Sequence, residues 1–322
     1  MNQRKVKNKM NPLRIVFMGT PDFSVPTLEA LVEKGHSIVG VYCQPDKEKG
    51  RGKQIQMPPV KVAALAHDLP VYQPITLKSD EVEQELRQLN PDVIIVIAYG
   101  KILPPWLIRL PKYGCINVHA SLLPNYRGAA PIHFAILNGD ATTGVTIMHM
   151  DDGLDTGAMI EKVEIPVKPL ETTGELFDRI ATLGGTAIND ILERWVVGSI
   201  TAEPQDDTFA TYTTKITKDM GHIDWSEPAR ALGGKIRGLN PAPGCFSFIN
   251  GKRVKLWMAY DINGESQCEP GTIVEFGTDY IDVATGKGIL RVTEVQPDNK
   301  KRMNAGDFSR GHQLKIGMAF HE

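Results

Sequence analysis

The chain has 322 residues, of which 42% are hydrophobic and 23% charged, a composition typical of a soluble globular protein with room for two domains. Its formal net charge of -2 argues against a strongly basic nucleic-acid-binding protein, although it leaves room for a local basic patch. No apolar run approaches the ~18 residues of a membrane-spanning helix, and the basic start MNQRKVKNKMNP precedes no signal-peptide pattern. We therefore expect a cytoplasmic protein with no membrane association.

Residues 13–200 alternate short apolar runs with amphipathic segments, which is typical of βαβ units around a parallel, doubly wound sheet. The runs predicted as strands are LRIVFMG, SIVGVYC, PDVIIVIAYG, CINVHA and GVTIMHM. The predicted helices span residues 25–34, 61–67, 129–137 and 173–197. Because the first turn, GTPDFS, lacks the G-x-G-x-x-G spacing, we expect a Rossmann-like α/β domain that binds no dinucleotide.

The pattern changes after a polar, threonine-rich connector at residues 202–219. Asn250-Gly251 stands between two strand-like runs, a strong hairpin signal, and five or six short strands follow in all, ending with HQLKIGMAF. A small OB-like β-barrel is the preferred interpretation, with a β-sandwich as the alternative. The expected divisions are a basic extension at 1–12, a catalytic Rossmann-like domain at 13–203, a linker at 204–219 and the OB-like domain at 220–322.

The four cysteines and eight histidines show no spacing typical of metal ligands. No C-x-x-C motif is present, so we expect reduced, buried thiols without a catalytic role and no metal site. The cysteines are Cys43, Cys115, Cys245 and Cys268.

The stretch GCINVHASLLPNYRGAAPI, residues 114–132, places polar side chains at every second position after an apolar lead. In an extended segment, Asn117, His119 and Ser121 therefore point to one side. They stand at the carboxyl end of a predicted strand, where open α/β sheets bind ligands. His119 could also be an ordinary hydrogen-bonded histidine at a strand end.

A second stretch, MDDGLDTG at residues 150–157, holds three carboxylates and follows the next strand. Its aspartates could be turn caps, but the loop could also converge on the same crevice as His119. An amide, an imidazole and a carboxylate, without a G-x-S-x-G nucleophile, suit acyl transfer between two bound molecules. Asn117 and His119 would stabilise an oxyanion, while Asp155 would orient His119 and help remove a proton from the attacking amine.

A third stretch, CQPDKEKGRGKQIQMPPVK at residues 43–61, is rich in lysine and glycine and follows the second strand. It could be a solvated surface loop. Alternatively, it is a basic flap that reaches over the crevice toward a polyanion, with Arg51 between two glycines best able to reach.

Seven segments resemble the folate-dependent formyltransferase family, and in particular its members that act on methionyl-tRNA. The similarity runs from about residue 13 to the C-terminus, and it is specific because the Asn-x-His strand, the S-L-L-P loop and the D-x-G-L-D-T-G loop keep their order and spacing. The segments are GTPDFSVPTLEAL, QPDKEKGRGK, PPVKVAA, VIAYGKILP, GCINVHASLLPNYRGAAPI, GVTIMHMDDGLDTG and IRGLNPAPG.

This resemblance implies that Asn117, His119 and Asp155 are the catalytic residues. They would transfer a formyl group from 10-formyltetrahydrofolate, the co-substrate, to the α-amino group of methionine on initiator Met-tRNA, with no metal. The residues that we expect to contact the folate are Ser121, Leu122, Leu123, Pro124, Tyr99, Asp152 and Gly153. The residues that we expect to bind the acceptor are Arg51, Lys53 and Arg127.

The resemblance also implies a monomer whose C-terminal barrel binds the tRNA body. Residues 204–322 carry 15 Lys plus Arg against 15 Asp plus Glu, so this affinity needs a clustered basic face. The candidates for it are Lys235, Arg237, Lys252, Arg253, Lys255, Lys300, Lys301 and Arg302. Two alternatives remain open: a sugar-nucleotide N-formyltransferase on the same scaffold, and a non-catalytic RNA-binding relative.

Overall fold

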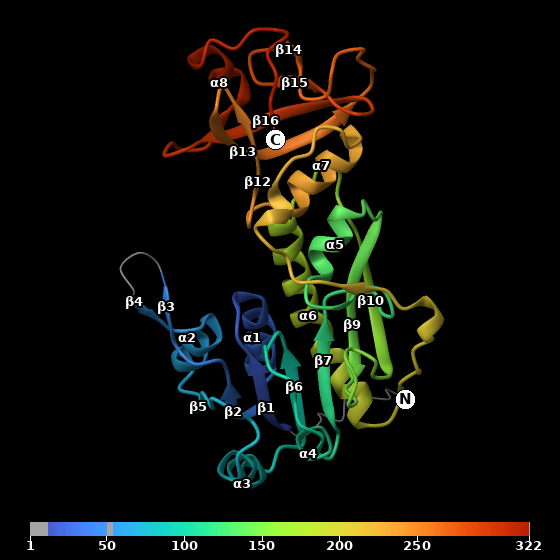
Figure 1. The fold of residues 1–322 in the computed structure, drawn as a ribbon. Coiled ribbons are helices and arrows are strands. Elements are labelled where there is room, and N and C mark those ends of the chain that lie inside the picture. Colours follow the sequence, from blue (N-terminus) through green and yellow to red (C-terminus); the bar gives the residue numbers. More distant parts are fainter. Residues whose placement is uncertain (1–11, 50–53, 322) are drawn as a thin grey trace, which may run out of the picture. The chain divides into compact units, whose positions relative to one another are not determined.

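The structure is a computed structural model that describes residues 12–49 and 54–321 (Figure 1). The chain divides into two compact units, each built from several stretches of sequence. Unit 1 comprises Met1–Gly128, Gly144–Glu164 and Asp178–Tyr212, and unit 2 comprises Ala129–Thr143, Ile165–Phe177 and Thr213–Glu322. The predicted boundaries at residues 203 and 219 stay predictions.

A seven-stranded sheet with the order β10-β9-β7-β6-β1-β2-β5 forms the centre of the N-terminal fold (Figure 1). The pairs β1–β2, β1–β6, β6–β7 and β2–β5 are parallel. The near-continuous apolar strands follow from this arrangement, because a parallel sheet is covered on both faces. The strands are β1 (Arg14–Gly19), β2 (Ser37–Tyr42), β5 (Val71–Tyr72), β6 (Val93–Ile97), β7 (Cys115–His119), β9 (Thr142–His149) and β10 (Met159–Pro166).

The strand order reverses between β1 and β6, since the chain builds outward from β1 first to β2 and β5 and then to β6 and β7. Ligands of open α/β sheets bind beside such a switch point, at the carboxyl ends of the strands. The loops that leave β1 and β6 meet there, because Thr20 Oγ1 donates to Tyr99 O at 2.9 Å. The doubly wound, parallel-dominated fold that the sequence predicts is therefore confirmed.

All four predicted helices are confirmed, within two residues at each end, but one long helix of the N-terminal fold was missed, as were the short helix Pro105–Ile108 and two helices of the C-terminal part, Ala229–Gly238 and Ala305–Gly311. The observed helices are α1 (Val25–Glu33), α2 (Pro59–Ala66), α4 (Pro105–Ile108), α5 (Pro131–Leu137) and α6 (Thr173–Val196). The missed long helix is α3 (Asp80–Leu89), whose N-cap Ser79 accepts from Val82 N–H and whose end is marked by Asn90 at φ 45°. Ser79 and Asn90 are ordinary start and stop signals.

The expectation that every strand of this sheet runs parallel is wrong at β9. Strand β9 pairs antiparallel with β7, with Ile116 opposite His149 and His119 opposite Thr146. The carboxyl end of β9 therefore lies beside the start of β7, and the following loop must turn back to approach His119. An apolar run reads alike in both directions, so the sequence pattern holds no information about strand direction.

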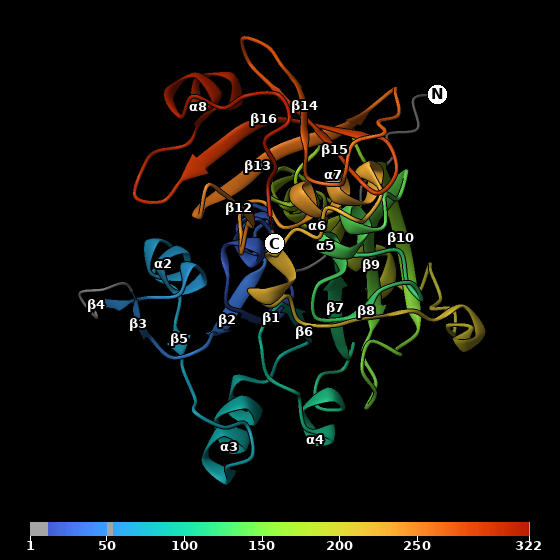
Figure 2. The ribbon, with the colours of Figure 1, turned by 45° about the horizontal axis from the view of Figure 1, so that its top comes forward.

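The C-terminal fold is an antiparallel sheet with the order β12-β13-β16-β15-β14, in which β17 pairs with β16 (Figure 2). The predicted Asn250-Gly251 hairpin is confirmed, with φ 50° and 70° at its two turn residues. The strands are β12 (Cys245–Ile249), β13 (Lys252–Ile262), β14 (Ile273–Phe276), β15 (Ile281–Ala284), β16 (Ile289–Pro297) and β17 (Met303–Asn304).

The two edges of this sheet are joined by residues 319–321. His321 bridges Phe248 on β12, and Ala319 bridges Thr272 at the start of β14. This connection closes the sheet as an OB-like barrel requires. The predicted strand HQLKIGMAF is wrong: helix α8 (Ala305–Gly311) is followed by two turns within residues 312–317, and only isolated bridges form at Ala319 and His321.

The remaining elements are short. They are η1 (Asp22–Ser24), η2 (Asp207–Phe209), η3 (Asp219–Gly221), β3 (Lys47–Lys49), β4 (Gln54–Gln56), β8 (Arg127–Gly128), β11 (Tyr212–Thr213) and α7 (Ala229–Gly238). Over the ranges that the structure describes, no helix combines the length and apolar character needed to cross a membrane. Cys43, Cys115 and Cys245 are buried free thiols, but Cys268 is exposed, so the expectation of a fourth buried thiol is wrong.

Candidate active site

Strand β7 positions the polar residues that the sequence singles out. Asn117 lies beside Val96 of β6 and is half-buried, and His119 is the last residue of β7 and is 6% exposed. Their spacing by two residues puts both side chains on one face of the sheet. Within the described residues the Asn117 amide makes no hydrogen bond, so its two donors are available to a bound molecule.

The two ring nitrogens of His119 have different partners. Nε2 lies 3.0 Å from Tyr126 O and Nδ1 lies 3.7 Å from Asp155 Oδ1. A carbonyl oxygen only accepts hydrogen bonds, so Nε2 carries a proton and donates it to Tyr126 O. Nδ1 and Asp155 Oδ1 are close enough for an ion-pair contact, although 3.7 Å is longer than a hydrogen bond.

Asp155 reaches His119 from the loop after β9. Its Oδ2 accepts from Gly128 N–H at 2.8 Å, which leaves Oδ1 toward the histidine. The loop returns closely against β9, because a Cβ on Gly157 would lie 2.0 Å from His149 O. The amide, the imidazole and the carboxylate that the sequence predicts thus lie within one part of unit 1, and His119 and Asp155 are in contact.

The other two aspartates of this loop have different roles. Asp151 Oδ1 accepts from Gly153 N–H at 3.0 Å and from Thr156 Oγ1 at 2.7 Å, so it caps the turn. Asp152 Oδ2 pairs with Arg109 at 2.6 Å, and both side chains are more than half exposed. The turn-cap alternative therefore describes Asp151.

The loop after β7 is held by buried hydrogen bonds. Ser121 Oγ donates to Asn125 O at 2.6 Å, and Leu123 N–H donates to Thr146 Oγ1 at 3.0 Å. Leu123 is fully buried, whereas Leu122 and Pro124 are partly exposed. The loop is thus rigid, with two apolar side chains at its surface.

Tyr99 lies in the loop after β6 and is 2% exposed. Its hydroxyl is buried without a hydrogen-bond partner among the described residues, and burial raises its pKa to about 12. The loop of residues 150–158 after β9, which we call the aspartate loop, begins with Met150. Met150 packs on the same apolar cluster as Tyr99 and Leu103.

Two large apolar side chains stand exposed on these loops. Ile102 is 92% exposed and Leu154 is 62% exposed. They follow Tyr99 and precede Asp155 in the chain, and both loops also supply polar groups. Exposed apolar side chains beside polar groups are typical of a surface that receives a planar, partly apolar ligand.

The base of the basic flap is anchored by an ion pair. Lys61 Nζ lies 2.7 Å from Asp46 Oδ2 and also donates to Gln73 Oε1, whose amide in turn donates to Asp46. Antiparallel strands β3 and β4 extend from this base (Figure 1). Arg51 and Lys53, the predicted acceptor-binding residues of the flap, lie outside the described residues.

Arg127 is 1% exposed and makes four side-chain hydrogen bonds to Gln205, Asp207 and Tyr212. Gln205 also donates to Asp155 O and Gly157 O. Sequence reasoning missed Gln205 altogether, because no local pattern links a connector glutamine to a loop fifty residues earlier.

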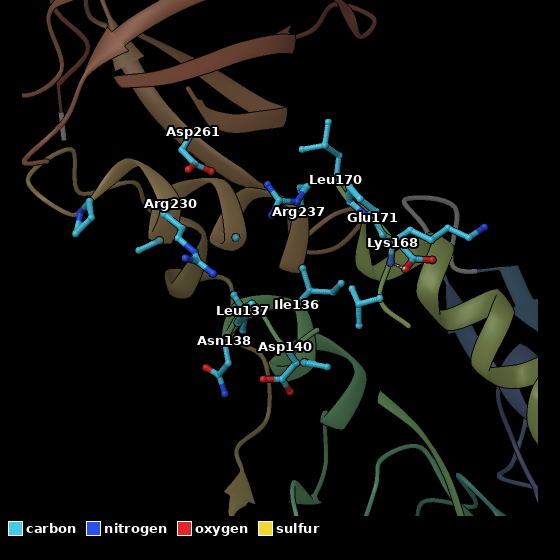
Figure 3. Close-up of a pocket in the computed structure, with 17 residues that line it drawn as sticks. Ile136, Leu137, Asn138, Asp140, Lys168, Leu170, Glu171, Arg230, Arg237 and Asp261 are labelled. Atoms are coloured by element: carbon cyan, nitrogen blue, oxygen red, sulfur yellow. Dashed lines mark hydrogen bonds between the residues drawn. The ribbon is translucent and has the colours of Figure 1, made fainter. Parts of the chain in front are cut away.

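A cavity of about 530 Å³ lies within unit 2, between the end of α5, residues 167–171 and α7 (Figure 3). Arg230 and Arg237 line it together with Asp140, Glu171 and Asp261, so its charges are mixed. Arg237 already donates to Ala259 O. The cavity contains none of the predicted catalytic residues. Across residues 12–49 and 54–321 no group of three metal-ligating side chains occurs.

Two family models match the chain. The model described as formyl transferase matches residues 13–192, and the one described as formyl transferase, C-terminal domain, matches residues 215–313. The chain therefore belongs to the formyl transferase family.

Curated relatives within this family are methionyl-tRNA formyltransferases. Those of Agathobacter rectalis and Citrifermentans bemidjiense are each 48% identical over 308 residues, which is 96% of this chain and 99% and 96% of theirs. The Bacillus licheniformis protein is also 48% identical, over 95% of this chain and 97% of its own length.

Solved structures with the same fold include HypX from Aquifex aeolicus with tetrahydrofolic acid and the sugar 3N-formyl transferase WlaRD. HypX has a TM-score of 0.63 at 16% identity over 94% of this chain, which spans 48% of the HypX chain. WlaRD has a TM-score of 0.66 at 18% identity over 91% of this chain and 100% of its own. At these identities the likeness shows the fold alone.

Proposed function

We propose that the protein transfers a formyl group from 10-formyltetrahydrofolate to the α-amino group of methionine on initiator Met-tRNA. The observation that carries this proposal is the contact of His119 with Asp155, beside Asn117, in a chain that is 48% identical to methionyl-tRNA formyltransferases over 96% of its length. Because the product starts translation, we propose that the reaction takes place in the cytoplasm. We further propose that the chain acts as a monomer.

In the proposed mechanism 10-formyltetrahydrofolate supplies the formyl group. The residues of this chain stabilise the charge that develops in the transition state and accept the proton that is released. Asn117 donates a hydrogen bond to the formyl oxygen as the α-amino nitrogen bonds to the formyl carbon, and His119, on the same face of β7, stabilises the developing negative charge electrostatically. Such a donor is worth ~2.7–4 kcal/mol of transition-state stabilisation. Asp155 takes the proton that the amine releases, and that proton then passes to the folate nitrogen as its bond to the formyl carbon breaks.

The loops around Tyr99, Ser121 and Asp152 fit a folate. A pterin and its linked benzoyl ring are planar and largely apolar, and the exposed side chains of Ile102 and Leu154 suit them. The exposed Asp152 carboxylate, which pairs with Arg109, and the backbone around Tyr99 supply polar contacts. We therefore assign the donor to Ser121, Leu122, Leu123, Pro124, Tyr99, Asp152 and Gly153.

We propose that the acceptor tRNA is bound by Arg51 and Lys53 of the flap and by one face of the barrel. On that face Arg253 stacks 3.9 Å from the Phe246 ring centroid, and Arg302 stacks 3.7 Å from that of Trp257. Cations beside aromatic rings are typical of surfaces that bind RNA backbone and bases.

Further cations border this face. Lys252, Arg253 and Lys300 line a cavity of about 600 Å³ at the hairpin end of β13, together with Phe308 and His312. Three of the candidates named above have other partners. Lys235 pairs with Glu227 at 3.2 Å and Arg237 donates to Ala259 O, whereas Arg302 pairs with Glu294 at 3.7 Å and still stacks on Trp257. The proposed tRNA face therefore consists of Lys252, Arg253, Lys255, Lys300, Lys301 and Arg302.

The decisive test is transfer of labelled formyl from 10-formyltetrahydrofolate to Met-tRNA, with a UDP-amino sugar and glycinamide ribonucleotide as parallel acceptors. We expect formyl-Met-tRNA as the sole product, with the rate falling at least 100-fold in His119→Ala. Arg51→Ala should reduce transfer to Met-tRNA steeply. Formyl on a sugar would favour the sugar-nucleotide alternative, and no transfer at all would favour a non-catalytic RNA-binding protein.

A further inference from the structure

Arg127 is a buried cation whose side chain is directed into the connector between the two family domains. Its Nε and Nη2 donate to Gln205 Oε1 at 3.0 and 2.8 Å, and Nη2 also donates to Asp207 Oδ1 at 2.7 Å. Its own backbone N–H donates to Thr211 O at 2.9 Å. Residues 205–212 are thus fastened to Arg127 by side chain and backbone together.

Arg127 determines which way the Gln205 amide faces. A guanidinium only donates, so the Gln205 oxygen must face it and the NH2 group must face the other way. That NH2 group donates to Asp155 O at 2.7 Å and to Gly157 O at 2.8 Å. The contact with Arg127 therefore fixes the two donors that hold the aspartate loop.

The backbone of Asp155 needs such support. Its φ is 54°, in the left-handed region that is unfavourable for a residue with a Cβ. The Gln205 bond holds the Asp155 carbonyl, and the Gly128 N–H holds Oδ2 of the side chain. Together they leave Oδ1 directed at His119 Nδ1.

The neighbours of Arg127 in the chain also touch the catalytic pair. Tyr126 O lies 3.0 Å from His119 Nε2, and Gly128 N–H donates to Asp155 Oδ2. One anchored segment, residues 126–128, thus contacts both the imidazole and the carboxylate.

We infer that Arg127 and Gln205 are positioning residues that hold Asp155 against His119 for the transfer step. In this role Arg127 acts through its buried hydrogen bonds to the connector. This differs from the direct contact with the acceptor that the sequence predicts for it. The inference rests on the proposed function, in which Asp155 takes part in proton transfer. It predicts that loosening the Gln205 bonds slows the chemical step without weakening the binding of either substrate.

Gln205→Glu separates this role from a merely structural one. A glutamate keeps, and strengthens, the contact with Arg127, but it has no donors for Asp155 O and Gly157 O. We expect an unchanged thermal midpoint, a kcat reduced 10- to 100-fold, and KM values for donor and Met-tRNA within two-fold of the native protein. Arg127→Lys, which loses the forked contact, should show the same split between kcat and KM.

Asn189→Asp is the matched control, because Asn189 also donates from an amide to a backbone carbonyl, that of Ala30, and contacts no site residue. It should leave kcat within two-fold. A Gln205→Glu protein with native kcat, or one whose kcat loss is matched by Asn189→Asp, would overturn the inference.

Amide hydrogen exchange gives a readout that does not depend on activity. Peptides covering residues 150–158 should exchange at least ten-fold faster in Gln205→Glu than in the native chain, and unchanged exchange would contradict the inference. If the native chain transfers no formyl group, the proposed function fails, whereas the exchange result still decides whether Gln205 holds the loop.

Discussion

Asp155 is held in the structure from two sides, by Gly128 N–H at its side chain and by Gln205 at its carbonyl. Asp155→Asn keeps an oxygen for Gly128 but removes the negative charge and the proton acceptor. We expect kcat for formyl transfer to fall ~10²–10⁴-fold, with little change in the thermal midpoint. Asp80→Asn, at the exposed start of α3, is the control, and a kcat within three-fold of native in Asp155→Asn would remove the carboxylate from the mechanism.

Asp282 forms the most buried ion pair of the barrel. It is 2% exposed, and its two oxygens accept from Arg291 at 2.8 and 2.7 Å, while Arg291 stacks 3.6 Å from the Tyr280 ring centroid. The pair raises the pKa of Arg291 above its ordinary value. Asp282→Ala leaves this cation unpaired, so we expect a loss of about 3 kcal/mol in unfolding free energy.

Denaturant unfolding followed by barrel tryptophan fluorescence measures this loss. The exposed Asp279→Ala is the control, for which we expect a change within about 0.5 kcal/mol. Equal effects of the two substitutions would show that the ion pair contributes nothing beyond a surface carboxylate.

At the residue scale the sequence could predict part of the site. The alternation of polar and apolar residues was enough to predict that Asn117 and His119 lie on one face of the sheet, because successive side chains of a strand point to opposite faces. The roles of Arg127 and Gln205 could not be predicted, since their contacts join residues that are 78 positions apart in the chain. A buried arginine and an exposed one are identical in the sequence.

Helix α6 begins with a reciprocal cap. Glu175 Oε2 accepts from Thr172 N–H at 2.9 Å, and Glu175 N–H donates to Thr172 Oγ1 at 3.3 Å. The hydrogen bond from the Thr172 backbone, followed by that from its hydroxyl, lowers the pKa of Glu175. The folded state therefore binds this proton less readily than the unfolded state does.

The cap should make stability depend on pH. Its contribution is complete above the ordinary glutamate pKa of ~4.3 and is lost as the pH falls through the lowered pKa. We expect the thermal midpoint of the native chain to exceed that of Glu175→Gln at pH 7, and the difference to shrink as the pH approaches 3. Glu164→Gln, on an exposed strand position, is the control, and a difference that stays constant with pH would contradict the assignment.

At the element scale, the apolar period and Pro or Gly boundaries predicted most strands and helices. Helix α3 was missed although Ser79 and Asn90 mark its ends, so the signal was present and unused. The direction of β9, which pairs antiparallel with β7, could not be predicted, because the apolar pattern of a strand is the same in both directions.

The net charge of the whole chain is close to zero, but positively charged side chains gather on one surface of the C-terminal fold. The formal charge is -2, yet six of the cations near the β12–β13 hairpin and β17 make up the proposed tRNA face. Removing Lys252 and Lys300 together should weaken tRNA binding and reduce the slope of log affinity against log salt by about 1.5–2. Titrations of Met-tRNA at several salt concentrations measure both quantities.

Lys287→Ala is the matched control for this slope, since Lys287 precedes β16 while Lys300 follows it. Nine strand residues separate the two positions, or roughly 30 Å. The control should keep the native slope, and an unchanged slope in the double variant would show that the tRNA body contacts another surface.

Helix α5 belongs to unit 2, although about 90 residues separate its end from the start of its packing partner α7. On the ribosome, where chains grow at ~5–20 residues per second, α5 emerges some 5–20 s before α7. During that interval the side chain of Leu137, which packs against Gly238 of α7 and the apolar cluster of unit 2, lacks its final cover. The nascent chain is therefore most exposed to chaperones and to misassociation midway through its synthesis.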